Sequence, residues 1–411
     1  MKLLHTSDWH LGRIFHERPL AEDQAHFLDQ IFGELSAADA AGRPYDALLV
    51  PGDIYDRPVP PTDAVRLLSG FLQRLRDALP ALEVFLLAGN HDSASRLSFA
   101  AGILASQKIH ICTDTAGFTT PTIIGAEGGA AAVYQLPFLS PGSISDESAP
   151  AAEQPLRTQQ ELLSEACRRI QAAHQARFPQ MPSVLCAHAF AQSAHTGGSE
   201  RRFIGTAEQV DAALFDGFTY AALGHLHKSQ PCGRTGRAFY SGAPLAYNFD
   251  DPPDTSMLRV ELNGTDAPSV EKIPFRPLHR IARLEGPFQR FYGAGADRQL
   301  IAEHKDDYVQ IVCTDPVLPQ SPIPLLRKNF PLALSFIRKA SEPGAASAAA
   351  ASLEERRSVI SSNDGGKPEK IYALFLKDAY GGSPPQDGAL ADAERALFLK
   401  AAEQYSWEES T

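Results

Sequence analysis

Residues of metal-binding types stand where five apolar runs of this sequence end. The runs occupy residues 3–10, 48–53, 84–92, 184–188 and 220–227, and each closes on a carboxylate, an amide or an imidazole. Hard divalent cations that bind phosphate favour oxygen and imidazole donors over thiolates. None of the seven candidate ligands is a cysteine; they are Asp8, His10, Asp53, Asn90, His188, His225 and His227. The pattern indicates a metal site.

The spacing of these residues suits two ions. Alternate residues on an extended backbone point to the same side, so Asp8 and His10 can chelate one ion together. A turn after the last run lets His225 and His227 diverge to two ions, and Asp53 has two oxygens with which to bridge them. Two ions about 3.5–4 Å apart can activate a water and clamp the phosphoryl oxygens of an in-line displacement.

His91 is adjacent to a candidate ligand but outside the ligand set. We expect it to donate a proton to the leaving alkoxide or to stabilise the developing charge. Asp92 could hold the His91 ring in the required tautomer. Asp56 is interpreted as a loop residue or as a residue behind the ligands.

Each of these motifs also has an ordinary structural interpretation. A lone Asp-x-His is a weak signal, and Gly-Asp after a strand is often only a turn. The segment Asn90-His91-Asp92 could be an Asx-turn followed by a helix cap. The ordered set of five strand ends, each closing on metal-type ligands, favours the metal site over these separate alternatives.

The elements that must position these residues are buried strands. Continuous apolar runs flanked by glycine are typical of strands covered on both faces in a parallel or mixed sheet. Open α/β sheets carry their chemistry beyond the carboxyl ends of such strands. Apolar periodicity predicts helices over 21–41, 62–79, 93–106 and 159–177, and short β-like runs at 238–241, 257–262 and 270–275 suggest an antiparallel part of a sheet. The third helix should use Leu97, Phe99, Ile103 and Leu104 as its apolar face. We expect an α/β domain over residues 1–276.

Composition changes near Pro277. Residues 277–340 predict a small α+β module with extended segments at 279–284 and 308–314 and an apolar helix at 333–338. Residues 341–368 are rich in Ala, Ser and Gly and are typical of a flexible linker. Residues 369–411 predict two short amphipathic helices, which are marginal unless their apolar faces dock on something.

Charge and cysteine content limit the possible partners and cellular compartment. The net charge of −11 argues mildly against a nucleic-acid surface, but bound divalent cations would weaken that objection. The best local basic surface for a phosphate backbone is the set Arg201, Arg202, Lys228, Arg234 and Arg237, for which a solvated run of charge is the alternative. Five widely spaced cysteines without a Cys-x-x-Cys pair fit thiols in a reducing compartment, and with no signal peptide or membrane span expected we predict a cytoplasmic protein.

The motifs together resemble a known family. Five segments are similar to the calcineurin-like metallophosphoesterases: 7–12, 52–56, 89–92, 187–188 and 224–227. Three segments are similar to the narrower family of SbcD-type bacterial nuclease subunits: 5–12, 199–205 and 240–244. The resemblance implies a four-layer α-β-β-α sandwich of two mixed sheets followed by a capping domain. It implies one Mn²⁺ held by Asp8, His10, Asp53 and His227, and a second held by Asp53, Asn90, His188 and His225. It also implies a transition-state role for His91, with Asp92 orienting it.

The resemblance also implies a function and partners. The expected activity is cleavage of DNA phosphodiesters, as an exonuclease on double-strand ends and an endonuclease on single strands or hairpins, in DNA repair, recombination and replication. The expected partners are DNA, a second copy of the chain packed through helices 62–79 and 93–106, and an SbcC-type coiled-coil ATPase held by the tail. The chain has no Gly-x-x-x-x-Gly-Lys-Ser/Thr loop of its own for ATP. The alternatives are a phosphoesterase for a small-molecule or protein phosphoester, and a scaffold with a vestigial site, against which the intact ligand set argues.

Overall fold

The computed structural model describes residues 1–125, 129–145, 156–191, 209–315 and 318–339. Residues Met1–Ile337 form one compact unit. The predictions for the linker 341–368, for the helices in 369–411, and for Arg201 and Arg202 lie outside the described residues.

The first of two large sheets holds three of the ligand-bearing strands. Its order is β16-β15-β1-β4-β5-β6. The central strands run parallel, and they are β1 (Lys2–His5), β4 (Ala47–Val50), β5 (Glu83–Leu87) and β6 (Ile109–Cys112). Two antiparallel strands, β15 (Ser256–Glu261) and β16 (Ser269–Pro274), extend it beside β1. The sheet is therefore mixed, with the predicted antiparallel part at one edge.

The second large sheet holds the other two ligand-bearing strands. Its order is β13-β14-β12-β9-β8-β7. The parallel strands are β8 (Ala131–Leu136), β9 (Ser183–His188), β12 (Tyr220–Gly224) and β14 (Ala238–Tyr240). The edge strands β7 (Thr122–Ile124) and β13 (Gln230–Cys232) are antiparallel.

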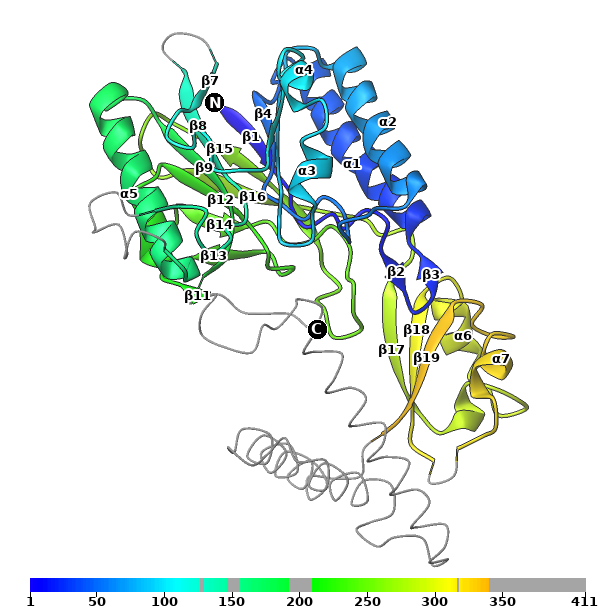
Figure 1. The fold of residues 1–411 in the computed structure, drawn as a ribbon. Coiled ribbons are helices and arrows are strands. Elements are labelled where there is room, and N and C mark those ends of the chain that lie inside the picture. Colours follow the sequence, from blue (N-terminus) through cyan, green and yellow to red (C-terminus); the bar gives the residue numbers. More distant parts are fainter. Residues whose placement is uncertain (126–128, 146–155, 192–208, 316–317, 340–411) are drawn as a thin grey trace, which may run out of the picture. The chain divides into compact units, whose positions relative to one another are not determined.

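The two sheets pack face to face, and helices cover their outer faces (Figure 1). Successive side chains of a strand point to opposite faces, so in β4 Ala47 and Leu49 enter the core between the sheets while Leu48 and Val50 enter the core under the helices. Helices α1 (Ala21–Ala40) and α2 (Thr62–Ala78) cover the first sheet, and α5 (Gln159–Arg177) covers the second. The predicted four-layer α-β-β-α architecture is confirmed.

A third, smaller sheet follows the sandwich. Its order is β17-β18-β19, with bounds β17 (Ile281–Gly286), β18 (Tyr308–Cys313) and β19 (Ala333–Arg338). Helices α6 (Arg298–His304) and α7 (Pro322–Leu326) accompany it, and it has a core cluster of its own. The predicted helix at Ala333–Arg338 is wrong: the segment is the edge strand β19. A segment of only six residues carries no decisive periodicity, and pairing beside the buried strand β18 decides its conformation.

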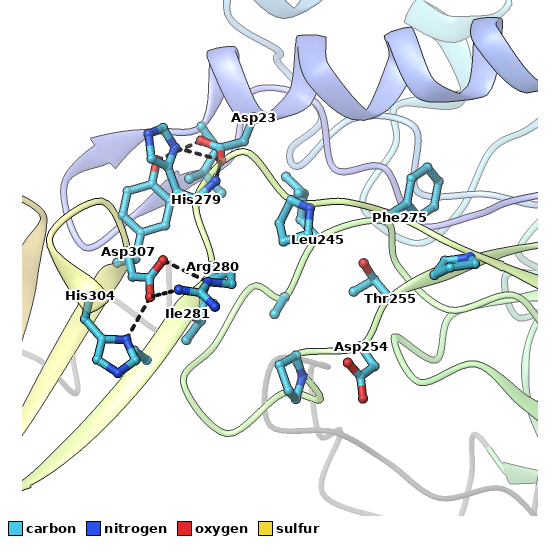
Figure 2. A pocket seen from close by; sticks show the side chains of 17 residues that line it. Asp23, Leu245, Asp254, Thr255, Phe275, His279, Arg280, Ile281, His304 and Asp307 are labelled. Atoms are coloured by element: carbon cyan, nitrogen blue, oxygen red, sulfur yellow. Dashed lines mark hydrogen bonds and ion pairs between the residues drawn. The ribbon is translucent and has the colours of Figure 1, made fainter. Parts of the chain in front are cut away.

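A buried carboxylate joins this small sheet to helix α1 (Figure 2). Asp23 is 2% exposed, and it accepts hydrogen bonds from the Tyr308 hydroxyl at 2.7 Å and from the His279 ring at 3.0 Å. Beside it, Arg280 and His304 both contact Asp307. These residues line a pocket of about 350 Å³. The two-stranded hairpin of β2 (Ile14–Phe15) and β3 (Arg18–Pro19) lies next to it, through the ring contact of Phe15 with Tyr308.

The predicted third helix is broken in two. The structure has α3 (Ala94–Leu97) and α4 (Ala101–Ala105), separated by Ala100 with φ of 61°. Leu97 is buried, but Phe99 is 83% exposed and Ile103 is 73% exposed. The prediction that these two face the core is therefore wrong.

All five cysteines have free thiols, as predicted. None of the described helices has the length and apolarity needed to cross a membrane.

Candidate metal centre

All seven candidate ligands lie at the carboxyl ends of β1, β4, β5, β9 and β12. Four of them have left-handed backbone: φ is 54° at Asp8, 44° at His10, 49° at Asp53 and 105° at His225. Residues other than glycine seldom adopt this conformation, and such strain concentrates at functional sites. The loops after β1 and β4 also pair with each other, because the His10 amide donates to the Asp53 carbonyl at 3.0 Å.

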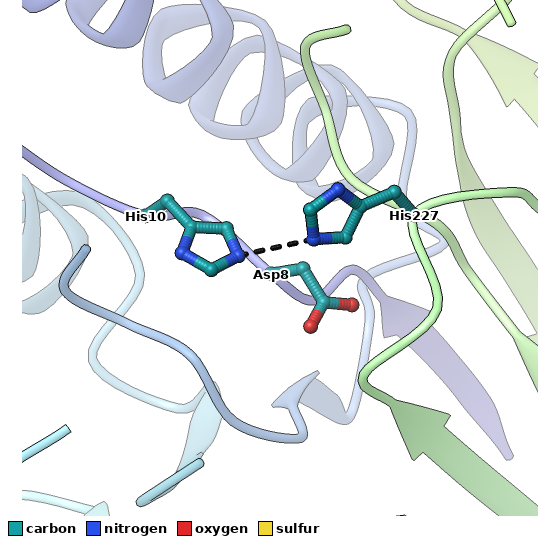
Figure 3. A group of neighbouring side chains, drawn as sticks. All are labelled: Asp8, His10 and His227. Atoms are coloured by element: carbon teal, nitrogen blue, oxygen red, sulfur yellow. Dashed lines mark hydrogen bonds between the residues drawn. The ribbon is translucent and has the colours of Figure 1, made fainter. Parts of the chain in front are cut away.

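Asp8, His10 and His227 form the first group of ligands (Figure 3). One ligand atom from each lies within 4.8 Å of the others. The Nε2 atoms of His10 and His227 are 3.1 Å apart, and His10 Nε2 is 3.7 Å from Asp53 Oδ2. The group therefore borders Asp53, as expected for a bridging carboxylate.

Asp53, Asn90, His188 and His225 form the second group. His188 Nε2 lies 3.6 Å from Asp53 Oδ2 and 2.8 Å from Asn90 Oδ1. His225 Nδ1 lies 3.1 Å from the same Asn90 oxygen and 3.3 Å from His188 Nε2. The structure thus brings together all seven predicted ligands, in two groups that both face Asp53 Oδ2.

The arrangement of acceptor atoms in the second group fits a cation. His188 Nδ1 contacts the Pro51 carbonyl at 3.0 Å, and because a carbonyl only accepts, this nitrogen carries the ring proton. Nε2 of the neutral ring then has a lone pair, which faces Asn90 Oδ1, another acceptor, at 2.8 Å. Two facing acceptors repel unless a positive charge lies among them. The oxygen and nitrogen donors, without any thiolate, fit hard or borderline divalent ions.

Burial keeps the four ligand histidines neutral, which is the form that binds metal. Desolvation lowers the pKa of His188 to about 4 and, with help from the nearby His188, the pKa of His225 to about 3. Desolvation also holds the pKa of His10 and of His227 well below the ordinary value. The imidazoles are therefore ready to bind metal across the neutral pH range.

Two glycines allow the close approach that fixes His188. Gly52 has φ of 97°, and a Cβ added there would lie 2.1 Å from His188 Nδ1. A Cβ on Gly224 would lie 1.8 Å from the Pro51 carbonyl oxygen. Any side chain at either position would displace the hydrogen bond that sets the His188 tautomer.

His91 lies beside the first group, with its ring centroid 4.8 Å from that of His10. Its Nδ1 contacts the backbone carbonyl of Asp56 at 2.9 Å, which leaves Nε2 as the other working nitrogen. The prediction that Asp92 orients this ring is wrong. The Asp92 carboxylate instead accepts the amides of Ile54, Tyr55 and Gly89 at 2.9–3.0 Å, so it holds the loops together. Burial and the neighbouring Asp53 raise the pKa of Asp92 to about 7.

The described basic residues do not form one surface. Lys228 directly follows the ligand His227 and is exposed. Arg237 lies at the opposite end of the second sheet, where its side chain donates to the Thr265 carbonyl at 3.2 Å and its own carbonyl accepts the Ala221 amide. Arg234 lies in the turn just before it. Of the three, Lys228 is the one at the end of the sheet that carries the metal ligands.

Of the groups behind the ligands, the sequence indicated Asp56 as a candidate but did not indicate Arg13 or Gln24. Asp56 accepts Arg13 at 2.8 Å, and its Oδ1 lies 3.6 Å from His10 Nδ1. Gln24 donates to the His10 carbonyl at 2.8 Å and accepts the Gly12 amide at 2.9 Å, so it clamps the turn after this ligand. No local signal marks Gln24, because it lies on the first turn of α1 among ordinary helical residues.

Comparison with known proteins agrees with this geometry. The family model described as calcineurin-like phosphoesterase matches residues 1–229, which include every ligand of both groups. The D component of the SbcCD nuclease from Staphylococcus saprophyticus subsp. saprophyticus is 27% identical over 337 residues, which are 82% of this chain and 84% of that protein. The chain belongs to the calcineurin-like phosphoesterase family.

Proposed function

We propose that this protein is the nuclease subunit of an SbcCD-type complex. It hydrolyses DNA phosphodiesters with two divalent ions, and Mn²⁺ is the proposed ion. The observation that carries the proposal is the convergence of seven oxygen and nitrogen ligands from five strand ends in two groups, with His10 of one and His188 of the other facing Asp53 Oδ2. The likeness to a protein named as part of a nuclease supports DNA as the substrate. Cleavage of double-strand ends, and of single strands or hairpins, belongs to the same proposal.

The ligands divide between two ions. Asp8, His10, Asp53 and His227 would hold one, and Asp53, Asn90, His188 and His225 would hold the other. Bound there, such ions supply Lewis-acid polarisation of the phosphoryl group and a water acidic enough to attack at neutral pH.

His91 would protonate the leaving oxygen. Its Nδ1 is committed to the Asp56 carbonyl, so Nε2 is the atom that can carry a proton to the substrate. The Asp56 carbonyl orients the His91 ring, a role that the sequence analysis assigned to Asp92. The loop that supplies this carbonyl is held by the Asp92 carboxylate through the Ile54 and Tyr55 amides.

The exposed apolar residues near α2 support a homodimer. Val65 on α2 is 43% exposed, Phe99 between α3 and α4 is 83% exposed, and Ile103 on α4 is 73% exposed. Exposed apolar groups of this size on neighbouring elements are typical of protein interfaces. A second copy of the chain is the proposed occupant, and an SbcC-type ATPase is the further proposed partner.

A nuclease assay tests the proposal. The full chain, with and without the ATPase subunit, is given hairpin and blunt duplex DNA in Mn²⁺ or Mg²⁺. We expect cleavage that a chelator abolishes and that Asp53→Ala eliminates, whereas Arg168→Ala, an exposed change on α5, retains it. Hydrolysis of small phosphoesters without any cleavage of DNA would favour the small-molecule alternative.

A further inference from the structure

The turn after β14 contributes no candidate ligand, yet it contacts the segments that carry ligands from three other strands. It consists of Tyr240, the last residue of β14, and of Ser241, Gly242 and Ala243 directly after it. The side chains of Tyr240 and Ser241 are fully buried, and Ala243 is 1% exposed. We call residues 240–243 the β14 turn.

Ser241 acts on Asp8 through Ser7. The Ser7 hydroxyl donates to Asp8 Oδ2 at 2.6 Å, a length typical of a hydroxyl bound to an ionised carboxylate. Its single proton is used there, so the proton in the 2.8 Å contact between the two hydroxyls comes from Ser241, which has the Gly242 carbonyl as a second, longer acceptor at 3.2 Å. The result is a directed chain from Ser241 through Ser7 to Asp8. The other oxygen of this carboxylate accepts the His225 amide at 2.9 Å.

Tyr240 acts on the segment after His188. Its hydroxyl donates to the Ala189 carbonyl at 2.8 Å and accepts the Ala191 amide at 2.9 Å. The buried hydroxyl thus acts as both donor and acceptor towards residues 189–191, which directly follow the ligand His188. They fix the direction in which the chain leaves His188.

Gly242 and Ala243 act on His227. The Ala243 amide donates to the His227 carbonyl at 3.0 Å. Gly242 has φ of 78°, and a Cβ there would lie 2.7 Å from the same carbonyl oxygen and 2.6 Å from the Ser229 amide nitrogen. Only glycine lets the turn approach the ligand loop this closely.

We propose that the β14 turn is the positioning element of the metal centre, with Ser241 setting the orientation of Asp8 and Tyr240 that of His188. The inference rests on the proposed two-ion site. Partners behind metal ligands typically change metal affinity by 10–100-fold. Because Asp8 and His188 belong to different groups, Ser241→Ala and Tyr240→Phe should each weaken a different ion.

Calorimetric titration of the metal-free full chain with Mn²⁺ tests this without relying on activity. We expect each variant to bind one of the two ions about tenfold more weakly, at the lower end of that range. Double-mutant cycles identify the ion. In an Asp8→Ala background, Ser241→Ala should have no further effect while Tyr240→Phe weakens the remaining ion. In a His188→Ala background, the two outcomes should be reversed.

Matched controls separate positioning from stability. Tyr134→Phe removes another buried hydroxyl of the same sheet, which contacts His174 at 3.0 Å, and Ser183→Ala removes a buried serine hydroxyl at the start of β9. Both should lose thermal stability to a similar degree as the β14-turn variants, with unchanged Mn²⁺ affinity. Wild-type affinity in Ser241→Ala and Tyr240→Phe, or equal losses in both backgrounds, would overturn the inference. Failure of the wild-type chain to bind Mn²⁺ would instead refute the metal site itself.

Discussion

Acidification of the metal-free protein should destabilise it through its buried histidines. The pKa of His188 is lowered from 6.5 to about 4, so its proton binds more tightly in the unfolded chain. Because the ring is buried in its neutral form, its contribution to the free energy of unfolding is fully present above pH 6.5. That contribution is lost as the pH falls from 6.5 towards 4. Between pH 7 and pH 5 the loss from His188 alone amounts to about 2 kcal/mol.

Urea unfolding in the presence of a chelator measures this loss. The free energy of unfolding is determined at pH 7 and pH 5 for the wild type, for His188→Gln, and for His26→Gln as a control on α1. His188→Gln should show a smaller fall in stability than the wild type by about 2 kcal/mol, and the control should follow the wild type. If His188→Gln falls as steeply as the wild type, the buried neutral ring is not the cause, and the reasoning fails. Saturating Mn²⁺ should restore stability at pH 6, because the ions bind only the folded, neutral form.

Three further predictions concern catalysis and assembly. His91→Ala should keep both metals but lose most phosphodiesterase activity, about 10²-fold or more, whereas Asp53→Ala should lose metal. Metal analysis and reaction rates of the two variants check this, and loss of metal in His91→Ala would contradict the proposed role of His91 as a proton donor. Phe99→Asp should shift the mass measured by light scattering at micromolar concentration from dimer to monomer, and a monomeric wild type would count against the dimer. Truncation after Pro368 should keep metal binding and basal nuclease activity but abolish co-purification with an SbcC-type ATPase; full capture by the truncated chain would move the partner surface to residues 279–339.

The strands and their ligands were predictable because both signals are local. Runs such as Leu48–Val50 are apolar without interruption, since these strands are buried on both faces, and the polar ligands follow directly at the carboxyl ends. Segments whose conformation depends on distant partners were not predictable. Phe99 and Ile103 fit a helical apolar face but are exposed, and Ala333–Arg338 becomes a strand because β18 lies beside it.

The groups that orient the ligands were the least predictable, because they come from remote parts of the chain. Ser7 and Ser241 are 234 residues apart, and the ring of His91 is held by a backbone carbonyl, which no residue type reveals. The mistaken role for Asp92 has the same origin. Adjacency in sequence suggested a contact with His91, but the backbone turns the carboxylate towards the amides of another loop.

The metal centre concentrates features that weaken the fold where they occur. Left-handed backbone at Asp8, His10, Asp53 and His225 costs on the order of 1 kcal/mol for each residue, and the facing acceptors of His188 and Asn90 add repulsion. A chain selected for stability alone would place glycine at the strained positions and would separate the acceptors. Cation binding offsets both costs at once, because it needs these donors close together and pointing inward. The departures from local preference therefore coincide with the ligands and leave the sheets beneath them regular.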